Sequence, residues 1–430
     1  MMQEWWCDAK LGVFLHWGVY AVRGVSESWS FFHGRISYED YMAQLDGFTA
    51  AKYDPEEWAD CFYRAGAKYA ILTTKHHDGI ALWDTQVNDL SVVRQSPAGR
   101  DLVGPYVEAL RKRGIKVGLY FSLLDWSNRD YASVWPEGGL GEDYRQFGPW
   151  EYCGEKENPQ AWQRFLECNR EQLRELCSLY EPDILWFDGD WWRSADQWRA
   201  GEFREYLHHL VPHVIINSRL SGYGDFETPE QELPVIPPAG EWELCMTVND
   251  NWGFRHTDKN FKGPREIIRI FAECIHGGGN LLLGFGPKED GTFPPEELAM
   301  FEQLGRWTQK YGEAIYATRR GIRPVHFAGG SSLSRDAKTL YLFVYDRPYE
   351  KVVLKGIAGK IVRISDLASG EELGYSSFGG HLPSHTSATL WIDFPESYHD
   401  EVISVIKVEL SEPIALDMNH GAVVTLGSAD

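Results

Sequence analysis

The chain alternates short apolar runs with longer stretches in which apolar residues recur at helical spacing. The apolar runs predict β-strands at residues 12–15, 69–73, 116–121, 184–187, 214–216, 244–248 and 280–283. Several are apolar at every position, which is typical of parallel strands covered on both faces. Helices are predicted at 101–113, 159–180, 194–210, 264–276 and 295–312. Repeated strand–helix units predict an α/β barrel, with a doubly wound sheet as the alternative.

Local signals mark where two of the helices begin and end. Asp54 precedes Pro55 and two glutamates, the arrangement of a helix N-cap with a first-turn proline and acids at the positive end of the helix dipole. The basic run 111–113 followed by Gly114 is typical of a last turn and its glycine stop. No G-x-G-x-x-G follows the first predicted strand, which disfavours the nucleotide-binding form of the doubly wound sheet.

The pattern changes after about residue 322. Alternating apolar and polar residues at 339–344, 360–364 and 388–392 are separated by Gly, Ser, Asp and Pro turns. This pattern predicts a small antiparallel β-sandwich. We therefore expect two domains, residues 1–321 and 322–430, with the chemistry in the first and a supporting role for the second.

Charge and composition exclude several classes of protein. The formal net charge is −21, and such a surface would repel a nucleic-acid backbone or an anionic membrane, so neither is expected as a partner. No run of 18 apolar residues predicts a transmembrane helix. The start of the chain lacks the pattern of a secretory signal, and seven scattered cysteines fit reduced thiols better than a disulfide framework. A cytoplasmic location is therefore expected.

The residues directly after the predicted strands are polar and aromatic. In an α/β barrel the functional groups lie just beyond the carboxyl ends of the strands. These positions are 16–18, 75–79, 122–126, 188–190, 217–219 and 249–254, and the tryptophans within or beside polar groups are Trp17, Trp29, Trp83, Trp126, Trp186 and Trp252. An aromatic face packs against the C–H face of a sugar ring while polar neighbours bind its hydroxyls. Each tryptophan alone fits a core position, but together they favour a carbohydrate site.

Asp188 is a candidate nucleophile. It directly follows the predicted strand 184–187, so a rigid element would present its carboxylate at the barrel mouth. A helix N-cap is the alternative, because the next element is helical. The second carboxylate of an acid–base pair could come from a later acidic stretch, and position alone does not choose among Asp225, Glu227, Glu230 and Glu232.

The histidine cluster has more than one interpretation. His76, His77 and Asp78, together with His16, contain the side chains of a metal site. Adjacent histidines at the end of a strand point to opposite sides, however, so both cannot easily bind one ion. Hydrogen bonding to ligand hydroxyls is favoured, with a structural role as the alternative. No G-x-S-x-G and no P-loop are present, which argues against a serine hydrolase and a P-loop protein.

Ordered motifs extend from about residue 8 to residue 317. They are Leu11–Gly18, Tyr53–Ala59, Ala65–Tyr69, Thr74–Gly79, Ala81–Trp83, Gly118–Tyr120, Ser122–Trp126, Leu185–Gly189, Gly277–Leu283, Gly286–Pro287 and Gly312–Tyr316. Jointly they resemble glycoside hydrolase family 29, the α-L-fucosidases. The C-terminal part resembles the family only in its predicted type of fold, because the family often carries a β-sandwich there. The resemblance implies an irregular (β/α)8-like TIM barrel and a retaining hydrolase.

The resemblance also implies roles for individual residues. Asp188 would be the nucleophile. The acid/base of family members lies on a later loop, and spacing back from residues 241–243, which resemble a recurring Lys-Trp-Glu, favours Glu230 with Glu227 as the runner-up. The positions that match fucose-binding residues are His16, Trp29, His76, His77, Tyr120, Trp186, Arg219 and Phe254.

One segment departs from the family pattern. Relatives usually read Ser-Glu-Trp-Tyr where this chain has Ser-Glu-Ser-Trp-Ser at residues 26–30. The carboxylate that touches the sugar in relatives is thus replaced by Ser28 or shifted to Glu27. This departure leaves two alternatives for the preferred sugar, fucose and a related sugar such as α-L-galactose.

The expected activity is the release of terminal α-L-fucose from fucosylated oligosaccharides or glycosides, without a metal or organic cofactor. A retaining glycosidase needs two carboxyl groups about 5–5.5 Å apart. Asp188, beside Arg219 and neutral histidines, is expected to attack as the carboxylate. Glu230, near aromatic and apolar groups, is expected to protonate the leaving oxygen and then to activate water. The sequence is also compatible with a non-catalytic sugar-binding protein and with a metal-dependent hydrolase.

Overall fold

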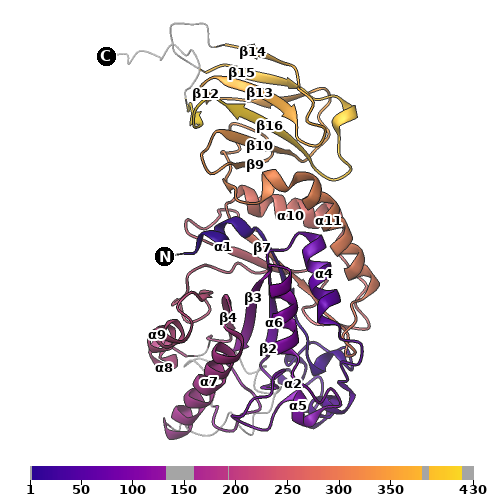
Figure 1. Ribbon diagram of the computed structural model, residues 1–430, viewed down its shortest axis with the longest axis vertical. Coiled ribbons are helices and arrows are strands. Elements are labelled where there is room, and N and C mark those ends of the chain that lie inside the picture. The colour runs from indigo at the N-terminus through magenta and orange to yellow at the C-terminus, as the bar shows by residue number, and fades with distance from the viewer. Residues whose placement is uncertain (1, 132–158, 192, 380–386, 419–430) are drawn as a thin grey trace, which may run out of the picture.

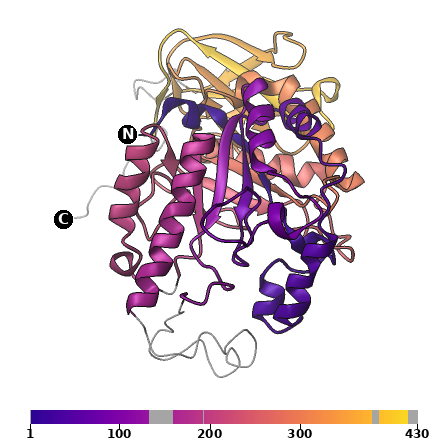
Figure 2. The same cartoon turned by 60° about the horizontal axis from the view of Figure 1, so that its bottom comes forward.

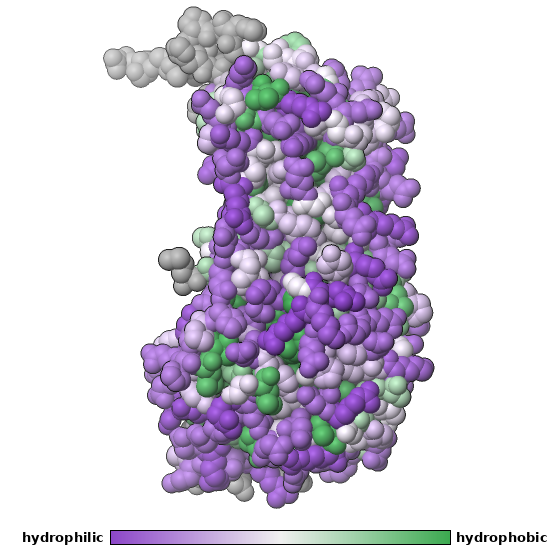
Figure 3. Space-filling view, viewed as in Figure 1, coloured by the Kyte–Doolittle hydropathy of each residue, from purple (hydrophilic) through white to green (hydrophobic). Residues whose placement is uncertain are grey.

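The computed structural model describes residues 2–131, 159–191, 193–379 and 387–418. Figure 1 shows an elongated molecule in which a parallel sheet and its helices form one part and antiparallel sheets form the opposite end. In the view of Figure 2, helices lie along the outside of the parallel sheet. On the face seen in Figure 3, hydrophilic residues dominate and the hydrophobic ones are scattered. No helix in the described ranges is both long enough and apolar enough to cross a membrane.

Seven parallel strands form the larger sheet, in the order β5-β4-β3-β2-β1-β7-β6. Their bounds are β1 Leu11–Leu15, β2 Tyr69–Lys75, β3 Lys116–Ser122, β4 Ile184–Asp188, β5 Ile215–Ile216, β6 Glu243–Thr247 and β7 Asn280–Phe285. Each lies where the apolar runs predict a strand. From β5 to β1 the order runs backward along the chain, and beyond β1 it continues backward from β7 to β6. The order is therefore cyclic, without the reversal that a doubly wound sheet has at its switch point. The strands therefore follow one another as in a curled, barrel-like sheet.

Residues 226–231 lie between the two edge strands, β5 and β6. Phe226 pairs with Asn217, which follows β5, and Glu227 and Glu230 pair with Trp242 and Cys245 through single parallel bridges. The backbone amides of Ser218 and Cys245 donate to the carbonyls of Phe226 and Pro229 at 2.8 and 3.0 Å. This segment connects the two edges without being a regular strand, so its position depends on a few hydrogen bonds.

Helices alternate with the strands of the parallel sheet. They are α1 Glu4–Ala9, α2 Trp29–Phe32, α3 Tyr38–Met42, α4 Pro55–Ala65, α5 Val92–Gln95, α6 Val103–Lys112, α7 Pro159–Tyr180, α8 Ala195–Trp198, α9 Ala200–Leu210, α10 Pro264–His276 and α11 Pro295–Ile315. The predicted cap of α4 is confirmed, since Asp54 accepts hydrogen bonds from the amides of Glu56 and Glu57. The single helix predicted over 194–210 is wrong. Arg199, at φ 53°, has left-handed backbone geometry and separates α8 from α9.

Antiparallel sheets follow the parallel part. The five-stranded sheet has the order β13-β16-β10-β9-β8, the three-stranded sheet the order β11-β15-β14, and β12 pairs with β17. The bounds are β8 Arg319–Arg320, β9 Gly330–Leu333, β10 Thr339–Val344, β11 Lys351–Leu354, β12 Ile357–Ala358, β13 Ile361–Asp366, β14 Tyr375–Phe378, β15 Thr389–Asp393, β16 Ser404–Leu410 and β17 Ala415–Leu416. Leu342 and Ile406 from the larger sheet and Leu354 and Ile392 from the smaller one share a single buried cluster.

The parallel and antiparallel parts share a packed boundary. Phe343 and Ile403 belong to the large apolar core of the parallel part, and the indole nitrogen of Trp307 on α11 donates to the carbonyl of Ile403 at 3.2 Å. The described cysteines are free thiols, as the scattered spacing predicts, and Cys153 lies outside the described residues.

Candidate active site

A small cavity opens at the carboxyl ends of the parallel strands. Its volume is about 100 Å³, and it is lined by Phe14, His16, Glu27, Trp29, His76, Tyr120, Trp186, Asp188, Trp191, Arg219, Glu230 and Trp252. The structure thus brings together both carboxylates and six of the eight binding residues expected from the sequence. His77 lies directly behind this wall, beside Asp188. Phe254 does not line the cavity, and its ring contacts the ring of His256 instead.

Asp188 is the last residue of β4 and is held by groups from three directions. Its Oδ2 accepts a hydrogen bond from the hydroxyl of Tyr120 at 3.0 Å and lies 3.6 Å from His77 Nε2. Its Oδ1 pairs with Arg219 Nη1 at 3.1 Å. The helix-cap interpretation of Asp188 is wrong, because Ser194 caps the next helix, α8. A buried carboxylate on a rigid strand end, with its geometry set by neighbours, suits a nucleophile.

Arg219 contacts both candidate catalytic carboxylates. While Nη1 pairs with Asp188, Nη2 pairs with Glu230 Oε2 at 2.6 Å, and Nε donates to the hydroxyl of Thr228 at 3.0 Å. Burial opposes the charge of Arg219, but Asp188 first, and then Cys245 and Glu230, outweigh it and raise the pKa of the guanidinium. The planar fork of one arginine therefore holds the two carboxylates close together.

The surroundings of Glu230 differ from the expected apolar ones. Its side chain is 40% exposed and faces the guanidinium of Arg219. The difference arises because Glu230 follows Pro229 on the irregular segment at the rim of the cavity, where Arg219 and solvent are nearer than the aromatic wall. This exposure leaves the side chain room to change partner when a ligand enters.

The other acidic residues of this stretch lie outside the cavity. Asp225 pairs with Arg204 on α9 and accepts from the amide of Ile216. Glu227 is exposed, and its backbone bonds to residues 241 and 243. Glu232 also does not line the cavity. Of the four carboxylates that sequence position left open, the fold places Glu230 opposite Asp188.

The histidines at the cavity are neutral. Burial is the main cause that lowers the pKa of His77 to about 3 and the pKa of His16 and His76 well below the usual value. The hydroxyl of Ser122 donates a hydrogen bond to the carbonyl of Leu124. The Ser122 oxygen is therefore the acceptor in its hydrogen bond with His77 Nδ1, at 2.6 Å. That bond leaves His77 Nε2 unprotonated, an acceptor that has no hydrogen-bond partner among the described residues. It can accept a hydrogen bond from a ligand hydroxyl.

The unusual segment at residues 26–30 supplies two different groups. Glu27 lines the cavity and accepts from the amide of Gly253 at 2.6 Å, whereas the hydroxyl of Ser28 contacts Nδ1 of His76. Burial raises the pKa of Glu27 to about 7. Of the two replacements that the sequence left open, the carboxylate at the cavity is that of Glu27, and Ser28 supports a histidine.

Trp186 forms the floor between Arg219 and a second buried carboxylate. The guanidinium of Arg219 lies 4.7 Å from the centroid of the Trp186 ring. The indole nitrogen of Trp186 donates to Glu243 at 3.0 Å, and the hydroxyl of Tyr69 donates to the same carboxylate at 2.6 Å. Burial raises the pKa of Glu243 to about 7. Glu243 therefore orients the ring on which Arg219 rests.

The tryptophans divide between the site and the core. Trp29, Trp186 and Trp252 line the cavity, whereas Trp17 and Trp83 are core residues. Trp126 is buried behind Trp29, at a ring distance of 5.1 Å. Of the six tryptophans that together favour a carbohydrate site, three line the cavity and three pack in the core, because residues beside a strand end can point into the helix layer.

Two lining residues were not predicted from the sequence. Trp191 stacks on Trp29 with centroids 5.7 Å apart, and Phe14 lines the cavity from the fourth position of β1. Trp191 lies three positions after Asp188, so a longer window after β4 would have included it. Phe14 carries no such signal, because an apolar residue in an apolar strand can face either side. No three potential ligand side chains within the described ranges are arranged to hold a metal ion.

Two carboxylates bound to one arginine, in a sugar-sized cavity with aromatic walls, define a glycoside hydrolase of the two-carboxylate type. The profile of the α-L-fucosidase family matches residues 1–313. Tissue α-L-fucosidase from Homo sapiens is 33% identical over 346 residues, 74% of this chain and 70% of that protein. The chain belongs to the α-L-fucosidase family, glycoside hydrolase family 29, and is a retaining glycoside hydrolase.

Solved structures agree with this assignment over nearly the whole chain. α-L-Fucosidase isoenzyme 1 from Paenibacillus thiaminolyticus has a TM-score of 0.84 and 31% identity, with 95% of this chain and 98% of that one covered. A family 29 α-L-fucosidase from Bacteroides thetaiotaomicron, trapped as a covalent intermediate with 2-fluoro-fucosyl fluoride, has a TM-score of 0.82 and 28% identity, with 94% and 95% covered. A covalent intermediate is the hallmark of the retaining mechanism.

Proposed function

We propose that this chain releases terminal α-L-fucose from fucosylated glycosides, with Asp188 as nucleophile and Glu230 as acid/base. The observation that carries the proposal is the pairing of both carboxylates with Arg219 in one cavity. A cavity of about 100 Å³ suits a single sugar ring and so favours action at a chain end. His16, Trp29, His76, Tyr120, Trp186 and Arg219 would bind the sugar, together with Glu27 and, through its free Nε2, His77.

In the first step, a carboxylate oxygen of Asp188 attacks the anomeric carbon and forms an ester with the sugar. The bond to the leaving oxygen breaks as Glu230 gives that oxygen its proton. Glu230 faces Arg219 in this structure, so it exchanges this contact for the glycosidic oxygen when the substrate binds. Arg219 and Tyr120 remain on Asp188 and hold it in line for the attack.

In the second step, water replaces the aglycone. Glu230, now a carboxylate, removes a proton from the water, whose oxygen attacks the anomeric carbon and displaces Asp188. Two inversions return the α configuration to the released sugar. The neutral histidines act as hydrogen-bond partners of the hydroxyls, because their lowered pKa values keep them uncharged.

Fucose is favoured over galactose by the walls of the cavity. Fucose carries an apolar methyl group where galactose has a hydroxymethyl group, and Trp29, Trp191 and Trp252 offer apolar surface. A faster turnover of an aryl α-L-fucoside than of the matching α-L-galactoside is expected. If neither glycoside is cleaved but L-fucose binds, the chain is a sugar-binding protein; full activity in EDTA disposes of the metal-dependent alternative.

Azide rescue of alanine variants tests the two catalytic roles separately. In Asp188→Ala, azide takes the place of the missing carboxylate, so a single inversion yields β-L-fucosyl azide. In Glu230→Ala, azide attacks the fucosyl-enzyme, and two inversions yield α-L-fucosyl azide. Glu227→Ala is the matched control and keeps ordinary hydrolysis. Undiminished hydrolysis by Asp188→Ala, or rescue in Glu227→Ala instead of Glu230→Ala, would overturn the assignments.

We further propose that the parallel sheet and residues 226–231 make up an irregular (β/α)8-like barrel, followed by a β-sandwich. The single bridges of residues 226–231 to both edges support this description. The division into residues 1–321 and 322–430 and the location in the cytoplasm stay predictions.

A further inference from the structure

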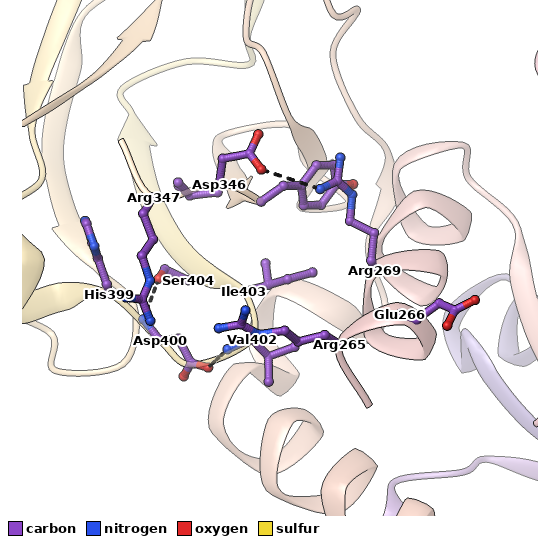
Figure 4. A pocket seen from close by; sticks show the side chains of 12 residues that line it. Arg265, Glu266, Arg269, Asp346, Arg347, His399, Asp400, Val402, Ile403 and Ser404 are labelled. Atoms are coloured by element: carbon purple, nitrogen blue, oxygen red, sulfur yellow. Dashed lines mark hydrogen bonds and ion pairs between the residues drawn. The ribbon is translucent and has the colours of Figure 1, made fainter. Parts of the chain in front are cut away.

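A second cavity lies at the boundary between α10 and the antiparallel sheets. It has a volume of about 470 Å³ and shares no lining residue with the catalytic cavity. Three arginines contribute to its lining, Arg265 and Arg269 from α10 and Arg347 from the turn after β10. The other walls come from residues 399–404, which precede and begin β16 (Figure 4).

Two of these arginines face the space without an acidic partner. Arg265 is anchored by its Nε, which donates to the carbonyl of Glu401 at 2.6 Å, and its terminal nitrogens have no partner among the described residues. Within the same residues, Arg347 makes no hydrogen bond or ion pair. Figure 4 shows their guanidinium groups directed toward one another across the cavity. Two like charges that converge in this way repel, and an anion between them would remove the repulsion.

The acidic lining residues are engaged elsewhere. Asp400 pairs with Lys310 at 2.5 Å and accepts from the hydroxyl of Tyr311 at 3.0 Å. Asp346 lies on the side of Arg269, at 3.9 Å, and the carboxylate of Glu266 is directed away from the other lining groups in Figure 4. Among the described residues, none of these three carboxylates forms an ion pair with Arg265 or Arg347.

Further polar groups at this cavity are available to a ligand. His399 lines the cavity, and its buried Nδ1 has no hydrogen-bond partner in the described part of the chain. Arg269 is stacked on the ring of Tyr345 at 3.9 Å, which holds the third guanidinium in place. Guanidinium groups recognise oxyanions by paired hydrogen bonds, which a neutral hydroxyl cannot match.

We propose that this cavity binds an acidic sugar through its oxyanion, a sulfate ester or a carboxylate, between Arg265 and Arg347. The volume is larger than one oxyanion requires, so it also accommodates the sugar that carries the group. The choice of a sugar rests on the proposed function, since a fucosidase meets glycans, whereas the oxyanion rests on the arginines alone. The site would hold an acidic part of a glycan whether or not a sugar occupies the catalytic cavity.

Calorimetric titration tests the proposal without any turnover, so its result is independent of catalysis. The probes are D-glucose 6-sulfate, D-glucuronate, D-glucose and inorganic sulfate, added to the full chain in the presence of excess L-fucose to occupy the catalytic cavity. We expect binding of one or both acidic sugars but not of D-glucose, and weaker binding at high salt. The acidic sugar that binds more tightly identifies the group as sulfate ester or carboxylate.

Arg347→Gln is the decisive variant, because Arg347 is exposed and its replacement breaks no described contact. We expect it to weaken binding of the acidic sugar about tenfold, while hydrolysis of an aryl α-L-fucoside is unchanged. Arg323→Gln, an exposed arginine outside the cavity, is the matched control and should bind as the parent does. Absence of binding, or equal binding by Arg347→Gln, would overturn the site. Inorganic sulfate binding as tightly as the acidic sugar would overturn the assignment to a sugar.

Discussion

The two sides of the catalytic cavity are built differently. On one side, Asp188 ends a strand whose five residues are all buried and which pairs along its length with β3. On the other side, Glu230 belongs to residues 226–231, which join β5 and β6 through single bridges. Regular pairing fixes the strand side at every residue, whereas the position of Glu230 depends on a few backbone bonds and on Arg219.

This difference matches the tasks of the two carboxylates. A nucleophile must stay in line with one carbon atom, and a rigid strand end provides that. An acid/base must serve first the leaving oxygen and then water, which a side chain at an exposed rim can do. Arg219 couples the two sides because it pairs with both carboxylates. Four variants test this comparison, in order of the expected effect.

Asp188→Asn should have the largest effect, since it removes the nucleophile from the rigid side. We expect kcat to fall about 10,000-fold, and to the same degree for aryl fucosides with good and with poor leaving groups. Steady-state kinetics on a series of substituted aryl α-L-fucosides measures this. Asp190→Asn, two residues further along the same loop, is the control and should retain far more activity. A fall that depends on the leaving group would show that Asp188 is not the nucleophile.

The loss of activity in Glu230→Gln should depend on the leaving group of the substrate. We expect a fall of about 100- to 10,000-fold for a poor leaving group and a much smaller one for an activated aryl fucoside, which needs no acid in the first step. The same series of substituted aryl α-L-fucosides measures how this loss depends on the leaving group. Glu227→Gln should behave as the parent, because Glu227 is exposed outside the cavity. Equal losses with all substrates would place the acid elsewhere.

Arg219→Lys tests the link between the two sides. Lysine keeps the charge but cannot pair with both carboxylates through a planar fork, so we expect kcat to fall about 100-fold. Arg204→Lys is the matched control, since Arg204 holds Asp225 on the outer side of the same segment. Circular dichroism should show that both variants fold. Parent-like kcat in Arg219→Lys would mean that the paired contact has no catalytic value.

Glu243→Gln should have the smallest catalytic effect but a clear effect on stability. Burial raises the pKa of Glu243 from 4.5 to about 7, so between these values the folded state keeps a proton that the unfolded state has lost. The free energy of unfolding therefore decreases as pH rises through this window, by about 3 kcal/mol for this group.

Urea unfolding at pH 4.5 and pH 8 measures that decrease. In Glu243→Gln the difference between the two pH values should be smaller than in the parent, although the variant is less stable at both. One of the two donors, Tyr69 or Trp186, would face the amide nitrogen. Glu297 is a buried glutamate on α11, and burial raises its pKa to about 8. Glu297→Gln should also reduce the change in the free energy of unfolding between the two pH values but leave kcat unchanged. An undiminished pH dependence in Glu243→Gln would contradict the raised pKa.

Much of the fold was predictable because it depends on local patterns. Seven apolar runs became the seven parallel strands, and the alternating runs after residue 322 became antiparallel ones. The break at Arg199 was not predictable, because the periodicity on both sides of it is helical. The strand ends marked Asp188 and His76 as site candidates, since a residue that directly follows a parallel strand must lie near the same edge of the sheet, whereas Tyr120, inside a strand, was marked only by the family resemblance.

By itself the sequence determined the order of strands and helices, the residue types at the strand ends and the family motifs. Only the tertiary structure decided that Glu230 lines the cavity rather than Glu227, that Glu27 and Trp191 join it, and that Phe254 does not. It alone brought Arg219 to both carboxylates and Arg265 to face Arg347. The physical reason is that hydrophobic periodicity sets which face of an element is buried, whereas contacts between distant segments depend on register and on loop paths, where a shift of one residue reverses a side chain.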